Sequence, residues 1–227
     1  MKKRIKAILK KNRLLRTIAK NILQLQDRIR KPISGKNNVV INNGVLFKVR
    51  YDVVGDNNLI EIGRNSVLSN MTIFIRGNNH ILRIAENCLY KGGSVWFEDN
   101  NCQVVIGQNT TIESAHLAVT EPNSKIVIGE DCLFSGEIVL RTGDSHSIID
   151  NETKKRINLA QNIEVSNHVW IGSRSTILKG VNIGHNSIIG TNSIVTRNIP
   201  SHSVAVGNPA RVIKNNIDWV RERIYEQ

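Results

Sequence analysis

Aliphatic residues recur along the first half of the chain at a fixed interval of 22 positions. Four stretches align with one another: "IEIGRNSVL", "LRIAENCLY", "VVIGQNTTI" and "IVIGEDCLF". Their central isoleucines are Ile62, Ile84, Ile106 and Ile128, and a weaker member, "VVINNGVLF", begins at Val39. This spacing is too long for a helical or a strand period, so it predicts a structural unit that repeats every 22 residues.

The period shortens to six residues in the second half of the chain. Valine or isoleucine stands at every sixth position: Val165, Ile171, Ile177, Ile183, Ile189 and Val195. A small or aliphatic residue follows four positions after each: Val169, Ser175, Val181, Ser187, Ser193 and Ile199. Such spacing fits short strands joined by tight corners, with one aliphatic side chain per six pointing inward. Three six-residue units make one triangular turn of 18 residues, and the 22-residue unit is such a turn with a few extra corner residues.

These periods predict an all-β solenoid whose stacked turns share one aliphatic core. The aromatic content of 4% agrees, because a narrow triangular bore accommodates few rings. Asparagine and glycine are expected at the corners, since both tolerate left-handed backbone angles. The sequence "NNIDWVRERIYEQ" has Ile217, Val220 and Ile224 at helical spacing, so residues 215–227 are expected to form a short capping or packing helix.

The first 32 residues form a separate unit, which is predicted to be a basic amphipathic helix. Its isoleucines and leucines recur at three- and four-residue steps, and its only proline is Pro32. Residues 1–31 contain twelve Lys and Arg and one acid, Asp27, and so carry most of the net charge of +12. Such a helix can lie on an anionic membrane surface or pack on the body or a partner subunit. Nucleic acid is not expected, because no aromatic interleaving or binding motif accompanies the basic run.

Several protein classes are excluded by composition. No run of 18 apolar residues appears, and no secretory signal is recognisable, so we expect a cytoplasmic protein, peripheral to the inner membrane face if the helix binds lipid. The three cysteines are too few and scattered for a disulfide framework. No Cys-x-x-Cys pair exists, and no metal is expected.

A polar excursion, "RTGDSHSIID", begins at Arg141 and separates the two periods. It contains His146, flanked by Asp144 and Asp150. The other histidines occupy repeat positions or flanking loops: His80, which is predicted to be a solvated corner residue, His116, His168, His185 and His202. Only His146 lies between the two registers.

The stretch from Asn167 to Lys214, with its "VWIG" and "GNPA" elements, closely resembles the hexapeptide-repeat acyltransferases. Within them it is similar to the galactoside, nodulation-factor and capsular-polysaccharide O-acetyltransferase branch. The resemblance implies a left-handed parallel β-helix over 33–214, with an active-site excursion at about 141–164. It also implies a homotrimer with acetyl-CoA bound between subunits.

In the family that this chain resembles, a histidine upstream of "VWIG" in a "DxH(P/S)" context is the general base, and His146 in "GDSHSIID" matches it. Acetyl transfer to a sugar hydroxyl needs one such base near neutral pKa. Asp144 or Asp150 could orient the imidazole. Alternatively, Asp144 could contact the sugar, or both aspartates could simply cap the loop.

The resemblance also implies contacts to acetyl-CoA. Trp170 and Ser173 would lie near the thioester, and Thr191, where the family often has alanine, would line the pantetheine channel. The remaining contacts would be Thr196 and Arg197 further out and Arg211 and Lys214 at the nucleotide phosphates.

We therefore expect an acetyl-CoA-dependent O-acetyltransferase acting on a bacterial cell-surface glycan or its lipid-linked precursor. Two alternatives remain open from the sequence. The same fold could acetylate the amine of an amino sugar or nucleotide-sugar. The chain could also be a non-catalytic β-helical binding scaffold or a zinc-dependent β-helical enzyme. Zinc would need three convergent histidines, and His116, His146 and His168 lack the matching spacing.

Overall fold

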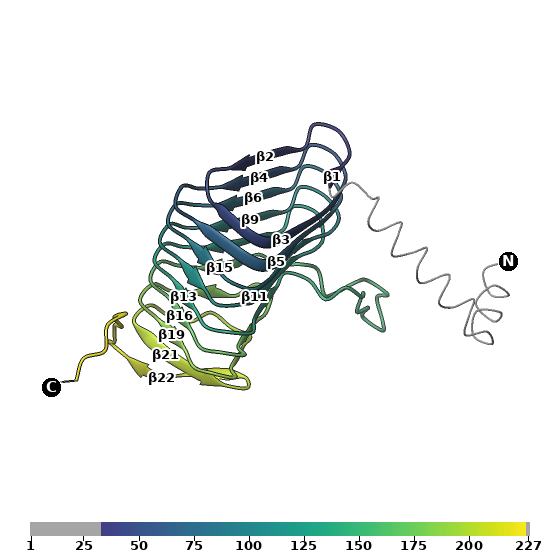
Figure 1. Ribbon diagram of the computed structural model, residues 1–227. Coiled ribbons are helices and arrows are strands. Elements are labelled where there is room, and N and C mark those ends of the chain that lie inside the picture. The colour runs from purple at the N-terminus through teal and green to yellow at the C-terminus, as the bar shows by residue number, and fades with distance from the viewer. Residues whose placement is uncertain (1–32, 226–227) are drawn as a thin grey trace, which may run out of the picture. The chain divides into compact units, whose positions relative to one another are not determined.

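The computed structural model describes residues 33–225, and these residues form a stack of short parallel strands (Figure 1). One sheet has seven strands, each from a successive turn of the chain. We refer to it as face 3; it consists of β2 (Val39–Asn42), β4 (Leu59–Ile62), β6 (Ile81–Ile84), β9 (Gln103–Ile106), β12 (Lys125–Ile128), β15 (Ile163–Val165) and β18 (Asn182–Ile183).

The other sheet has fifteen strands and forms two further faces. They are joined because β5 (Val67–Arg76) pairs with β7 through its first residues and with β8 through its last. Face 1 consists of β7 (Leu89–Tyr90), β10 (Thr111–Ile112), β13 (Leu133–Phe134), β16 (Trp170–Ile171), β19 (Ile188–Ile189) and β21 (Ser203–Gly207). Face 2 consists of β8 (Gly93–Phe97), β11 (Ala115–Val119), β14 (Ile138–Arg141), β17 (Thr176–Ile177) and β20 (Ile194–Val195). The remaining strands are β1 (Ile33–Ser34), β3 (Val45–Val54) and β22 (Ala210–Asn215), of which β22 pairs antiparallel with β21.

The register of face 3 follows the two sequence periods. Ile62, Ile84, Ile106 and Ile128 lie opposite one another on successive strands, 22 residues apart. Ile128 next pairs with Val165, after the excursion, and Val165 pairs with Ile183, 18 residues further on. The predicted inward residues from Val165 to Val195 are at most 2% exposed. The parallel all-β solenoid expected from the sequence is therefore confirmed.

Asparagine occupies many of the corners, as expected. Asn57, Asn79 and Asn101 have φ between 57° and 60°, a left-handed conformation that asparagine adopts more readily than most residues. Side chains at these corners bond between turns: the Asn79 amide donates to Asn101 Oδ1 of the next turn at 3.1 Å. Gly55, with φ of 139°, permits close stacking, because a Cβ there would lie 1.8 Å from the Gly77 carbonyl oxygen.

His80 corrects one expectation. The sequence suggested a solvated corner residue, but the side chain is fully buried, at 0% exposure. The His80 backbone N–H donates to Asn58 Oδ1 at 2.9 Å, and its Nδ1 accepts from the backbone N–H of Cys102 at 3.2 Å. Burial lowers the pKa of His80 and favours the neutral ring. The histidine is thus part of the hydrogen-bonded stack between turns.

The predicted C-terminal helix over 215–227 is also wrong for the residues described, because 216–225 contain no helix. Trp219 is buried and stacks on His168, with ring centroids 4.1 Å apart. The indole Nε1 donates to the His168 carbonyl oxygen at 2.8 Å, and Arg221 donates to Asp131 at 2.9 Å. Contacts to the body therefore hold the segment in an irregular path, in place of the helical hydrogen bonds that its periodicity suggested.

His168 is held between the solenoid and this segment. Burial alone would lower its pKa, but the hydrogen bonds to the Trp219 carbonyl oxygen and the Asp131 carboxylate outweigh it and raise the pKa. His168 is therefore a structural contact that fastens the C-terminal segment.

The N-terminal helix expected over residues 1–32 lies outside the described residues. Within 33–225 no helix has the length and apolar character needed to cross a membrane.

Candidate active site

A loop leaves the solenoid between β14 and β15 and carries His146 (Figure 1). It falls within the excursion predicted at 141–164, where the repeat step lengthens from 22 to 37 residues. The loop folds back on itself through an antiparallel bridge between Ile149 and Arg156. The turn at its tip is closed by Asp150, whose Oδ1 accepts from the Thr153 backbone N–H at 2.7 Å.

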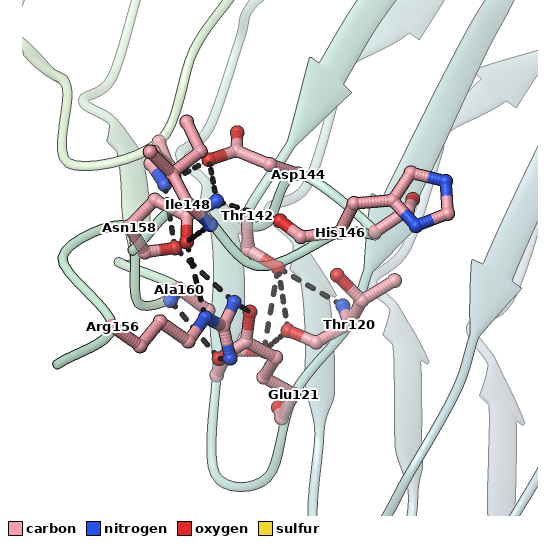
Figure 2. A network of polar contacts seen from close by, with 12 residues as sticks. Thr120, Glu121, Thr142, Asp144, His146, Ile148, Arg156, Asn158 and Ala160 are labelled. Carbon is pink, nitrogen blue, oxygen red and sulfur yellow. Dashed lines mark hydrogen bonds and ion pairs between the residues drawn. The ribbon is translucent and has the colours of Figure 1, made fainter. Parts of the chain in front are cut away.

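Asn158 joins the two arms of the loop, as Figure 2 shows. The side chain is only 7% exposed. Its Nδ2 donates to Asp144 Oδ2 at 2.9 Å and to the His146 carbonyl oxygen at 2.7 Å. Its Oδ1 accepts from the backbone N–H of Ile148 at 2.7 Å. One buried amide thus holds the backbone at His146 and Ile148 together with the Asp144 carboxylate.

A second contact ties the loop to the solenoid. Arg156 forms a bidentate ion pair with Glu121, which follows β11; the Nη1 to Oε2 distance is 3.0 Å, and Nη2 pairs with Oε1. The Ala160 backbone N–H also donates to Glu121 Oε2, at 3.2 Å. The Arg156 guanidinium lowers the pKa of the Glu121 carboxyl, so the pair stays ionised at neutral pH.

The His146 side chain is exposed and projects away from this network (Figure 2). Its ring has no hydrogen-bond or ion-pair partner among residues 33–225, whereas its backbone is held by Asn158. His146 lines a cavity of about 450 Å³ with Glu98, Thr120 and Arg156 among its other walls. A fixed backbone with a free imidazole at a cavity suits a proton acceptor that awaits a substrate.

The two aspartates beside His146 have other partners. Asp144 Oδ2 accepts from Lys179 Nζ as well as from Asn158, and the hydrogen bond from Lys179 lowers the Asp144 pKa. The Asp150 carboxylate caps the turn at Thr153, which lowers its pKa. Neither carboxylate contacts the imidazole, so Asp150 matches the loop-capping interpretation, and Asp144 can act on His146 only through the loop.

The residues predicted for the site fall along two separate edges of the solenoid. Asp144, His146, Thr196 and Arg197 lie at the edge where face 2 turns into face 3, together with Lys179. Trp170 lies on face 1, 38% exposed, and Ser173 and Thr191 follow at the edge between faces 1 and 2.

Ser173 and Thr191 are stacked on successive turns of that second edge. The backbone N–H of Asn192, the next residue after Thr191, donates to the Ser173 carbonyl oxygen at 2.9 Å. Arg211 is exposed near the same edge. It pairs with Val206 in the hairpin of β21 and β22, and the Gly207 N–H of this hairpin donates to Ser193 Oγ at 3.1 Å. Lys214 is exposed at the far end of β22, opposite Val204. One chain therefore does not bring the predicted base and the predicted thioester contacts together.

Three residues that shape the site had no sequence signal. Asn158, Arg156 and Lys179 each contact residues 12 to 35 positions away in the chain. Their types are ordinary for a polar loop or corner, and only the folded loop shows that they converge.

The remaining histidines, His116, His185 and His202, have contacts of their own. Ser94 Oγ hydrogen-bonds to His116 Nδ1 at 2.7 Å, and burial and then nearby Arg141 lower the His116 pKa. His185 and His202 pack edge to face, with centroids 4.8 Å apart. Within 33–225, no three His, Cys, Asp or Glu side chains are grouped as metal ligands.

The largest cavity described, about 890 Å³, lies elsewhere and contains none of the predicted site residues. It follows face 3 over salt-bridged pairs such as Arg64 with Glu86 and Arg83 with Glu61. We place the candidate site at the cavity of about 450 Å³, because it contains the exposed His146 imidazole on a loop held by Asn158.

Two solved structures are similar to this chain over most of its length. The polysialic acid-specific acetyltransferase NeuO is 36% identical, with a TM-score of 0.75, and the match covers 86% of this chain and 89% of that one. The polysialic acid O-acetyltransferase OatWY is 30% identical, with a TM-score of 0.77, covering 85% and 93%.

A curated relative is matched over a shorter segment. The polysialic acid O-acetyltransferase of Escherichia coli O1:K1 / APEC is 42% identical over 91 residues, which are 40% of this chain and 30% of the relative. No protein-family model matches the chain.

The fold and the likeness to NeuO and OatWY agree with the resemblance found in the repeat, and the solenoid matches a left-handed β-helix. The chain belongs to the hexapeptide-repeat acetyltransferase family, in its capsular-polysaccharide O-acetyltransferase branch.

Proposed function

We propose that the protein is an acetyl-CoA-dependent O-acetyltransferase that acts on a hydroxyl of a bacterial capsular polysaccharide or its lipid-linked precursor. The observation that carries the proposal is the rigid loop that presents His146 at a cavity, on a chain similar to a polysialic acid acetyltransferase over 89% of that enzyme's length. Thiol release from acetyl-CoA provides the readout for a direct test.

In the proposed mechanism His146 is the general base. Its imidazole takes the proton from the acceptor hydroxyl as the oxygen attacks the thioester carbonyl carbon. The C–O bond forms, the C–S bond breaks, and the imidazolium returns the proton to the departing CoA thiolate. Asp144 has a positioning role, since its contacts to Lys179 and Asn158 hold the loop that carries the base.

The proposed acetyl-CoA contacts use side chains of face 1 and of the two edges. Trp170, Ser173 and Thr191 would border the acetyl and pantetheine groups. The acetyl and pantetheine groups are uncharged, whereas the nucleotide end carries phosphates and needs cations. That charge would come from Arg197, Arg211 and Lys214, all exposed, with Thr196 next to Arg197.

A complete site then requires two copies of the chain. The base lies at the edge between faces 2 and 3, and the thioester contacts lie on face 1 and at the edge between faces 1 and 2. A head-to-tail contact between copies, closed into a ring, can place one copy's His146 against the next copy's Trp170. We therefore propose a homotrimer with three equivalent sites.

The proposed location is the cytoplasmic face of the membrane, with residues 1–31 as the attachment. Their charge of twelve basic residues against one acid favours an anionic lipid surface. The full chain should sediment with vesicles containing anionic lipid, and the chain lacking residues 1–31 should stay in the supernatant. Equal sedimentation of both, or loss of assembly on truncation, would assign the segment a packing role instead.

The function is tested by incubating the full chain with acetyl-CoA and purified capsular polysaccharides, with amino sugars as the competing acceptors. We expect thiol release that depends on a polysaccharide, with an alkali-labile acetyl ester on the product. An alkali-stable acetamide on an amino sugar would show an N-acetyltransferase. No acceptor-dependent thiol release from either class would contradict acetyl transfer altogether.

A further inference from the structure

A row of side chains crosses the outer surface of face 2 and ends beside the His146 loop. Phe74, Trp96, Ala118 and Arg141 lie directly opposite one another on β5, β8, β11 and β14. Neighbouring strands are about 4.8 Å apart, so the row runs along the solenoid axis. The mechanism above makes no use of these residues.

Ala118 leaves a hollow in this row. It is the small member between the Trp96 ring and the Arg141 guanidinium, and the cavity above it has a volume of about 230 Å³. The walls of this hollow are Trp96, Glu98, His116, Ala118, Thr120, Arg141 and Ser145. Three of them, Glu98, Thr120 and Ser145, also line the cavity that contains His146, so the two cavities share a wall.

The aromatic wall is fixed before any ligand arrives. Trp96 stacks on Phe74 with centroids 3.6 Å apart and an interplanar angle of 15°. The Arg76 guanidinium, two residues further along β5, lies 4.0 Å from the Phe74 centroid. This packing supports the half-buried indole from behind, so little side-chain freedom is lost when a ligand stacks on it.

The polar walls face the hollow with unused hydrogen-bonding capacity. Arg141 donates to Ser145 Oγ at 2.9 Å but has no carboxylate partner among residues 33–225. In the same range the Glu98 carboxylate has no ion-pair partner. The hollow thus combines one apolar ring with a separate cation and anion.

We infer that this hollow is a second acceptor subsite, which binds the sugar unit next to the one that is acetylated. A sugar ring has an apolar C–H face, which suits Trp96, and a rim of hydroxyls, which suits Arg141 and Glu98. The shared wall then places the adjoining unit in the cavity of His146. The inference rests on the proposed function and makes the preferred acceptor a chain of at least two sugars.

The test compares acceptors of one and two sugar units with the full chain and three variants. Wild type should show about three- to tenfold higher kcat/KM for the two-unit acceptor, since one additional stacked ring contributes an effect of this order. Trp96→Ala, which removes the ring, and Ala118→Leu, which fills the hollow, should abolish that preference. Both should leave the KM for acetyl-CoA unchanged. Phe47→Ala is the matched control, because Phe47 is an aromatic residue 57% exposed on β3 and lines neither cavity.

Three outcomes would overturn the subsite. The first is equal use of one- and two-unit acceptors by wild type. The second is an unchanged preference in both face-2 variants. The third is a change in the mass of the assembly in these variants but not in Phe47→Ala, which would make the row a contact between copies. Absence of transfer by wild type to any glycan would instead overturn the proposed function, and the subsite with it.

Discussion

Replacing His146 with alanine is expected to lower kcat for acetyl transfer by about 10²–10⁴-fold, the usual contribution of a general base. The imidazole is exposed at the cavity, and its ring has no structural partner within residues 33–225. The fold should be unaffected, because the loop is held by the His146 carbonyl oxygen, the Asn158 amide and the Glu121–Arg156 pair. Thiol release under saturating acetyl-CoA and acceptor measures the change.

The matched control is His185→Ala, which removes another exposed histidine from a repeat corner. It should retain wild-type kcat. The His146→Ala protein should also keep its assembly mass and its affinity for CoA. Turnover within about threefold of wild type in His146→Ala would show that the base is elsewhere.

Mixing two inactive variants is expected to restore activity. His146→Ala lacks the base, and Thr191→Trp fills the proposed pantetheine channel at the other edge of the solenoid with a bulky ring. Because we propose that each site takes these two edges from different copies, every mixed trimer would contain one complete site of three. Activity should therefore rise from near zero toward about one third of wild type in purified mixed trimers.

The experiment needs two different affinity tags, so that tandem purification selects mixed assemblies. Each variant alone, purified in the same way, sets the background. Thr191 is exposed, so the tryptophan should be accommodated without unfolding, and a thermal melt checks this. Mixed assemblies that stay inactive would place both edges of a site in the same chain, or the channel away from Thr191.

The periods in the sequence were sufficient to predict the core. Ile62, Ile84, Ile106 and Ile128 align across successive strands because each turn exposes an inner face that only the next turn can cover. The same logic located the excursion around His146, since an interruption of the repeat can only be accommodated outside the stack.

Two predictions from the sequence were wrong because a tertiary contact outweighed the local pattern. Residues 217–224 have helical spacing, yet Trp219 stacking on His168 outweighs a short helix with few internal hydrogen bonds. His80 looked like a polar corner residue. It is instead buried, since hydrogen bonds to Asn58 and Cys102 on adjacent turns satisfy its backbone N–H and its Nδ1.

The sequence by itself determined the solenoid, its inward residues and the place of the histidine loop, because those follow from a repeat that every turn must satisfy. Only the tertiary structure decided which groups hold that loop and which edge each candidate residue occupies. Asn158 and Lys179 meet Asp144 across 14 and 35 residues, and no local pattern encodes contacts at such separations. The structure also showed that Asp144 binds Lys179 and leaves the imidazole free, since the cation lies one turn away at the same edge.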